Sequence, residues 1–155
     1  MLGVVHDPCR DEMFAAVRGR GASLNGVPIG VSEAHDPAHA LVATGFSYSA
    51  QARVVQARAA NEVLVATQDV RRGGSAALDL AWVACGRVDA FYEVPLKPWD
   101  RAAGELLVKE AGGAVSPLPP IDGEADSGVL AAAPRLHDPM RRIVSEALYP
   151  PRTPS

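Results

Sequence analysis

The sequence has 155 residues, of which 48% are hydrophobic and 21% are charged, and its formal net charge at pH 7 is −3. This length fits one domain with a sizeable core, and the composition excludes a largely disordered chain. The slight acidity and the lack of a basic run argue against nucleic acid or an anionic membrane surface as a partner. No apolar stretch reaches the roughly 18 residues of a membrane span, and the amino-terminal residues lack the pattern of a secretory signal. We therefore expect a cytoplasmic protein.

The first part of the chain predicts short strands separated by turns. Four apolar segments bounded by turn residues indicate strands over residues 3–5, 13–17, 27–31 and 41–46. Asn25-Gly26 predicts a tight turn, because both residues tolerate a positive φ. Residues 32–40 are polar and predict a loop.

The second part alternates helical and strand patterns. Helices are predicted over residues 50–65, 75–85, 100–111 and 138–148. Short strands are predicted over residues 67–70, 88–94, 114–115 and 129–132. This alternation predicts an α/β domain over residues 1–149, and the proline-rich end, residues 150–155, predicts a disordered tail.

Asp100 is a candidate metal ligand at the point where a loop enters a predicted helix. The alternative is an N-cap, since an aspartate there accepts hydrogen bonds from unpaired backbone N–H groups. Magnesium takes carboxylate oxygens, and one carboxylate can serve both purposes. The neighbouring Trp99, like Trp82, is predicted to be a packing anchor.

Two further segments carry candidate binding residues. Gly74, Ser75 and Ala76 open a predicted helix, where exposed N–H groups can receive phosphate or hydroxyl oxygens, although many ordinary helices begin in this way. Glu93 ends a predicted strand, a position that in α/β folds often faces a ligand crevice but can equally be solvent-exposed. Asp79 is expected to be solvated or paired locally. No histidine has the spacing of a metal site or a catalytic triad, so all four are expected at the surface: His6, His35, His39 and His137.

In order and spacing, these segments together resemble the inositol monophosphatase family over residues 3–148. The matching segments are Gly3-Val4-Val5-His6-Asp7-Pro8, Gly19-Arg20-Gly21-Ala22, Leu24-Asn25-Gly26, Gly74-Ser75-Ala76-Ala77-Leu78-Asp79-Leu80, Ala90-Phe91-Tyr92-Glu93, Pro98-Trp99-Asp100-Arg101-Ala102-Ala103-Gly104 and Glu110-Ala111-Gly112-Gly113. The last two segments form the most specific part, a W-D-x-A-A-G…E-A-G-G signature. The bacterial inositol-1-monophosphatase-like branch is the most similar, and histidinol-phosphate phosphatases are a near relation.

The resemblance implies a layered α/β sandwich and Mg²⁺-dependent hydrolysis of a phosphate monoester such as inositol monophosphate. By position, Asp100 matches an aspartate that binds a metal. Glu93 matches a carboxylate that contacts substrate hydroxyls. Gly74, Ser75 and Ala76 match the loop and helix start that lie against the sugar-like ring.

The sequence also departs from the family pattern. Family members carry a G-E-E motif and a D-P-x-D-G-T motif upstream that supply the other metal ligands, and neither string occurs here. Asp100 and Glu93 alone cannot form a multi-ligand magnesium site. We therefore expect a truncated, C-terminal portion of a phosphatase, inactive by itself, that associates with a missing N-terminal half or forms a homo-oligomer.

The alternative is a non-catalytic remnant that binds a phosphate or polyol weakly or serves as a dimerisation module. In either case, truncation predicts an exposed sheet edge and an exposed apolar face, which favour self-association and low stability.

Overall fold

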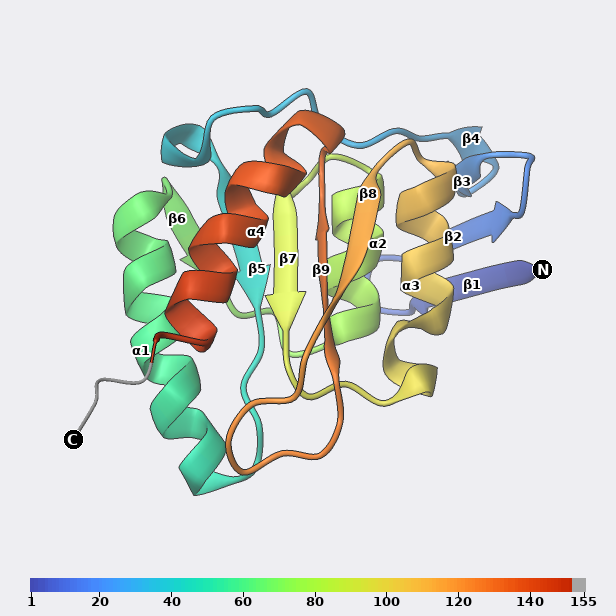
Figure 1. Cartoon of the computed structure of the whole chain (residues 1–155). Helices are drawn as coiled ribbons and strands as arrows, with labels where there is room; N and C mark the ends of the chain where they lie inside the picture. The colour runs from blue at the N-terminus through green and yellow to red at the C-terminus, as the bar shows by residue number, and fades with distance from the viewer. Residues whose placement is uncertain (152–155) are drawn as a thin grey trace.

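The computed structural model describes residues 1–151 and contains two β-sheets and four α-helices (Figure 1). One sheet is antiparallel, with the strand order β1 (Leu2–Asp7), β2 (Glu12–Val17), β3 (Ala22–Leu24) and β4 (Val27–Pro28). The other is mixed, with the order β6 (Asp69–Arg71), β5 (Leu41–Thr44), β7 (Ala90–Glu93), β9 (Gly128–Ala132) and β8 (Ala114–Leu118). The helices are α1 (Ala50–Ala66), α2 (Ala76–Ala84), α3 (Pro98–Glu110) and α4 (Pro134–Leu148), and a 3₁₀ turn, η1, spans Pro37–His39.

These elements form four layers. Helices α1 and α4 cover one face of the five-stranded sheet, α2 and α3 cover the other, and the four-stranded sheet packs on the far side of α2 and α3 (Figure 1). One apolar core lies between the five-stranded sheet and α1/α4, and it includes Val42, Leu130 and Met140. The second surrounds α2 and α3 and includes Phe14 and Phe91. The predicted layered α/β sandwich is confirmed.

Most predicted elements are present. Strand β3 (Ala22–Leu24) was not predicted, and the other differences lie at the ends of elements. Helices α3 and α4 begin at Pro98 and Pro134, before the predicted starts, because proline fits the first helical position, where its missing N–H is not needed. Strand β4 is shorter than predicted and ends at Pro28. The predicted Asn25-Gly26 turn is confirmed, with φ angles of 48° and 81°.

The predicted tail falls largely outside the described residues, which end at residue 151. Pro150 and Pro151 belong to no helix or strand. Among the described residues, no helix combines the length and the apolar character needed to cross a membrane.

The outer face of the four-stranded sheet is exposed and largely apolar at β1 and β2. Alternate residues of β1 point away from the core, and Leu2 and Val4 are 66% and 46% exposed. On β2, Val17, which pairs with Leu2, and Met13, which pairs with His6, are exposed as well. Strand β1 is also the edge of its sheet, so one row of its backbone groups has no partner strand within residues 1–151. The sheet edge and apolar face expected from the sequence are both present.

Candidate active site

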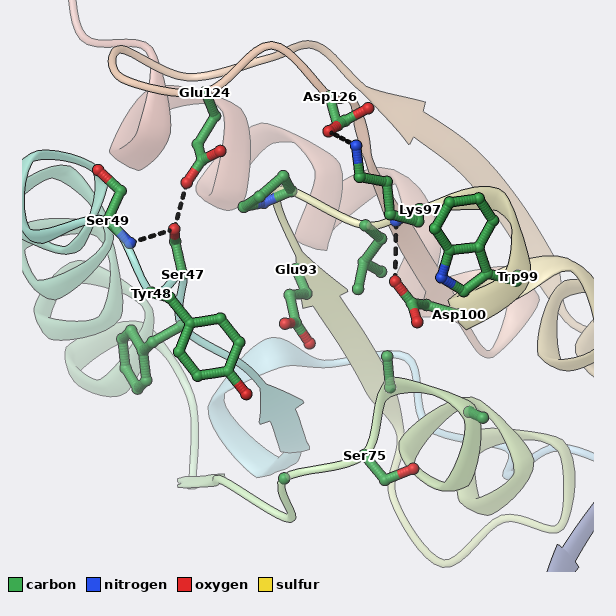
Figure 2. A pocket seen from close by; sticks show the side chains of 16 residues that line it. Ser47, Tyr48, Ser49, Ser75, Glu93, Lys97, Trp99, Asp100, Glu124 and Asp126 are labelled. Atoms are coloured by element: carbon green, nitrogen blue, oxygen red, sulfur yellow. Dashed lines mark hydrogen bonds and ion pairs between the residues drawn. The ribbon is translucent and has the colours of Figure 1, made fainter.

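A cleft of about 780 Å³ lies where β5 and β7 end and where α2 and α3 begin (Figure 2). Strands β5 and β7 are parallel neighbours, so their carboxyl ends meet at one edge of the sheet. All five residues selected from the sequence line this cleft, namely Gly74, Ser75, Ala76, Glu93 and Asp100. The fold therefore brings together residues that lie up to 26 positions apart, from residue 74 to residue 100.

Helix α2 contributes its amino-terminal end. The Ser75 hydroxyl caps the helix by accepting a hydrogen bond from the Leu78 N–H at 3.4 Å. Gly74 precedes the cap with a backbone φ of 95°, which residues with a Cβ rarely adopt. This turn at Gly74 leads the chain into the helix. The first N–H groups of a helix have no partner within it, so this end of α2 can donate to oxygen atoms of a ligand.

Glu93 is the last residue of β7, and its half-buried carboxyl group lies in the middle of the cleft (Figure 2). Its pKa is raised to about 7, chiefly by burial and also by the negative charges of Asp79 and Asp100, while the positive charge of Arg72 opposes the shift. Gly45, at the end of β5, makes room for this group, because a Cβ there would overlap the Glu93 carboxylate. Near neutral pH, Glu93 can therefore either accept a hydrogen bond from a ligand hydroxyl or donate one.

Asp100 is the third residue of α3, so the N-cap interpretation is wrong. The cap position belongs to Lys97, and one Asp100 oxygen accepts a hydrogen bond from the Lys97 backbone N–H at 2.9 Å. The Lys97 ammonium group instead pairs with Asp126 at 2.6 Å. The second Asp100 oxygen makes no hydrogen bond to any described residue, which leaves it available to a ligand.

The donor set of the cleft falls short of a magnesium site. Within residues 1–151, no three His, Cys, Asp or Glu side chains lie close enough together to hold a metal ion. Magnesium requires near-octahedral coordination by oxygen, although water and substrate phosphate usually supply several of the ligands. The free oxygen of Asp100 suits such an ion as one ligand, but the described residues do not form the site by themselves.

The solvated alternative for Asp79 and the surface position expected for His137 are both wrong. Asp79 is 3% exposed rather than solvated, and burial raises its pKa to about 6, against an opposing effect of Arg72. Its carboxylate lies against Gly73, where a Cβ would be 2.5 Å from Oδ1. His137 is also partly buried, with a side chain 13% exposed that contacts the Ser116 hydroxyl at 3.1 Å, away from the cleft. Neither burial has a local signal in the sequence, because the residue type alone does not tell which side chain the fold covers. His137, for example, contacts Ser116, which lies 21 residues away.

The cleft also contains residues that the sequence did not single out, or whose setting it predicted wrongly. Trp99 is 78% exposed at the rim, so it is not a packing anchor, whereas Trp82 is partly buried beneath the guanidinium of Arg10. Tyr48, which follows β5, is 98% exposed and also lines the cleft. Glu124, from the loop before β9, accepts a hydrogen bond from the Ser47 hydroxyl on one side of the cleft (Figure 2).

Comparisons with known proteins agree with this architecture. A model of the inositol monophosphatase family matches residues 1–148. The chain belongs to the inositol monophosphatase family. Among curated relatives of this family, the Nus factor SuhB of Escherichia coli K12 is 52% identical over 116 residues, a match that covers 74% of this chain and 43% of that protein.

Two solved structures show the same fold. SuhB from Mycobacterium tuberculosis superposes with a TM-score of 0.86 at 36% identity, covering 95% of this chain and 59% of that chain. The inositol monophosphatase from Anabaena (Nostoc) sp. PCC 7120 gives a TM-score of 0.83 at 38% identity, covering 94% and 58%. The chain thus spans about half the length of the family members that it matches.

Proposed function

We propose that this chain forms the alcohol-binding side of a phosphomonoester hydrolase that acts on inositol monophosphate or a similar polyol or sugar phosphate. The observation that carries this proposal is the meeting of the α2 start, the β7 end and the α3 start in one cleft. Family membership supports the reaction type.

Each of these elements has a role in the proposal. The backbone N–H groups at Gly74, Ser75 and Ala76 lie against the hydroxyls of the ring. Glu93 binds a further hydroxyl, and its raised pKa lets it act as acceptor or donor near neutral pH. Asp100 offers its free oxygen to Mg²⁺, which when bound would activate water and stabilise the leaving oxygen.

The remaining metal ligands must come from outside the described residues. We propose that a polypeptide carrying the G-E-E and D-P-x-D-G-T motifs supplies them by associating with this chain. The exposed apolar face of β1 and β2 and the free edge of β1 support such an association, because a further strand and apolar side chains can be accommodated there.

The test mixes the purified chain with the part of the M. tuberculosis relative that this chain does not cover and measures phosphate release from myo-inositol 1-phosphate with Mg²⁺. We expect the mixture to be active and the chain alone to be inactive. Asp100→Asn should reduce the activity of the mixture by about 10- to 100-fold, since a neutral amide oxygen is a weaker magnesium ligand than a carboxylate. The matched control is Asp69→Asn, an exchange of the same kind on β6, outside the cleft.

Two outcomes would contradict this scheme. Turnover by the chain alone that disappears in Asp100→Asn would show that the described residues suffice. A mixture that forms a complex yet never releases phosphate would reject the enzymatic proposal.

The second candidate is a binding module without turnover. The curated relatives carry the name Nus factor, and the apolar sheet face is a surface suited to a protein partner. A complex that forms without phosphate release would favour this candidate. Histidinol phosphate is the alternative substrate, and parallel assays of the mixture with both esters separate the two.

A further inference from the structure

Two aromatic side chains stand almost free of the protein at the cleft. Tyr48 and Trp99 are 98% and 78% exposed, and both line the cleft that contains Glu93. They come from different segments, Tyr48 from the connection between β5 and α1 and Trp99 from the first turn of α3. Figure 2 shows Tyr48 on one side of Glu93 and Trp99 on the other.

The backbone that carries Tyr48 is firmly held. Arg53 donates hydrogen bonds to the carbonyl oxygens of Ser47 and Tyr48 at 3.1 and 2.8 Å. Gln56 accepts from the Ser47 N–H at 2.9 Å and donates to the Val94 carbonyl at 2.6 Å, which ties this turn to the end of β7. The exposure of Tyr48 therefore does not come from a loosely held loop. The turn holds the Tyr48 backbone in place while its ring stays exposed at the cleft.

Trp99 is held in a comparable way. It lies between Lys97 and Asp100, whose hydrogen bond of 2.9 Å closes the first turn of α3. The Lys97 side chain is fixed in turn by its ion pair with Asp126 at 2.6 Å. Both aromatic residues thus project from ordered backbone toward the same ligand space, and neither contributes to a core of the described chain.

We propose that Tyr48 and Trp99 are specificity-determining residues, which pack against the apolar C–H surface of a ring in the alcohol part of the substrate. This inference rests on the proposed function. A six-membered polyol ring has C–H groups that can lie on an aromatic face, while its hydroxyls remain free to reach Glu93 and the α2 start. An open-chain polyol has no such rigid surface and loses more conformational entropy on binding. The cleft accordingly selects ring alcohols over open-chain alcohols.

The test uses myo-inositol and glycerol as probes, because free polyols require neither metal nor turnover. Saturation-transfer NMR on the isolated chain measures the two dissociation constants. We expect tighter binding of myo-inositol than of glycerol. Tyr48→Ala and Trp99→Ala should each weaken myo-inositol binding about 3- to 10-fold, and Tyr48→Phe and Trp99→Phe should bind like the wild type, since they keep a ring.

Val65→Ala is the matched control, because Val65 is an equally exposed apolar residue on α1, outside the cleft. Amide spectra of each variant establish that the fold is retained. Unchanged myo-inositol binding in both alanine variants would overturn the inference, and so would a wild-type chain that binds glycerol as tightly or binds neither polyol. Phosphate release by the mixed halves is measured separately, so the proposed function can stand when this inference fails.

Discussion

Asp79 and Glu93 are two carboxyl groups whose surroundings disfavour the charged form. Each lies against a glycine of another segment, Asp79 against Gly73 and Glu93 against Gly45. The pKa of both groups is raised, chiefly by burial. Carboxyl groups with raised pKa values gather at functional sites, and here the two are close enough for the charge of Asp79 to act on Glu93.

Replacing Asp79 by asparagine should stabilise the chain at alkaline pH. The pKa of Asp79 rises from 3.8 to about 6 on folding, so the native state holds this proton more tightly than the unfolded state does. That stabilisation is complete below about pH 4 and is lost as the pH rises through 6. We expect Asp79→Asn to raise the free energy of unfolding at pH 8 by about 2 kcal/mol and to flatten its pH dependence. Urea titrations at several pH values measure both effects, and a variant with the pH dependence of the wild type would contradict the burial argument.

Gly45→Ala should impair the site and spare the fold. Its Cβ would overlap the Glu93 carboxylate, which must then turn away. The ligand then loses its hydrogen bond to Glu93, and we expect myo-inositol to bind about tenfold more weakly. Gly30→Ala is the control, since a Cβ there meets only ordinary contact, 3.7 Å from the Ala111 oxygen. Equal binding by the two variants would show that Glu93 does not hold the ligand.

At the scale of elements, the motifs that carry the family resemblance also hold helices and strands together. Both carboxylate oxygens of Glu110, near the end of α3, accept hydrogen bonds, from the N–H groups of Gly19 at 2.9 Å and Gly21 at 3.0 Å. This clamp fixes the β2–β3 turn to α3. On the same helix, Gly104 lies directly against Leu80 of α2, so the two helices that open into the cleft are closely packed.

Gly104→Ala tests this close approach. An added Cβ would lie 2.5 Å from the Leu80 Cβ and 2.7 Å from its Cδ1, so the helices must move apart. Alanine gains about 1 kcal/mol in helix propensity, but overpacking costs typically about 1–3 kcal/mol. We expect net destabilisation and a lower melting temperature. Ala102→Ser, which also adds one heavy atom but on the exposed side of α3, should be nearly neutral. A Gly104→Ala variant more stable than the wild type would contradict the close packing of Gly104 against Leu80.

At the scale of the whole molecule, the described residues expose an apolar surface to solvent. Leu2, Val4, Met13 and Val17 form an apolar surface on the outer side of the four-stranded sheet, next to the free edge of β1. Apolar sheet faces and unpaired edges favour association with another chain. Whether that chain is a second copy or the motif-bearing half, this surface is where we expect the contact.

Self-association of the isolated chain is the corresponding prediction. We expect sedimentation velocity to show a concentration-dependent oligomer. Leu2→Thr combined with Val4→Thr should weaken association at least tenfold, because threonine keeps the strand preference and removes apolar area. Val65→Thr, at an exposed position on α1, serves as control. A clean monomer with a sharp, concentration-independent melt would speak against an interface on this face.

The sequence by itself determined the types of most elements and the candidate site residues, because these depend on local chemistry. A strand end marks Glu93, a glycine pair marks the start of α2, and Asp100 stands in a specific motif. Only the tertiary structure decided the surroundings of these residues, that is, which side chains are buried and which are exposed. The burial of Asp79 and the exposure of Trp99 depend on how the helices, loops and sheets pack. Gly45 and Glu93 lie far apart in the chain, so no local pattern encodes their contact.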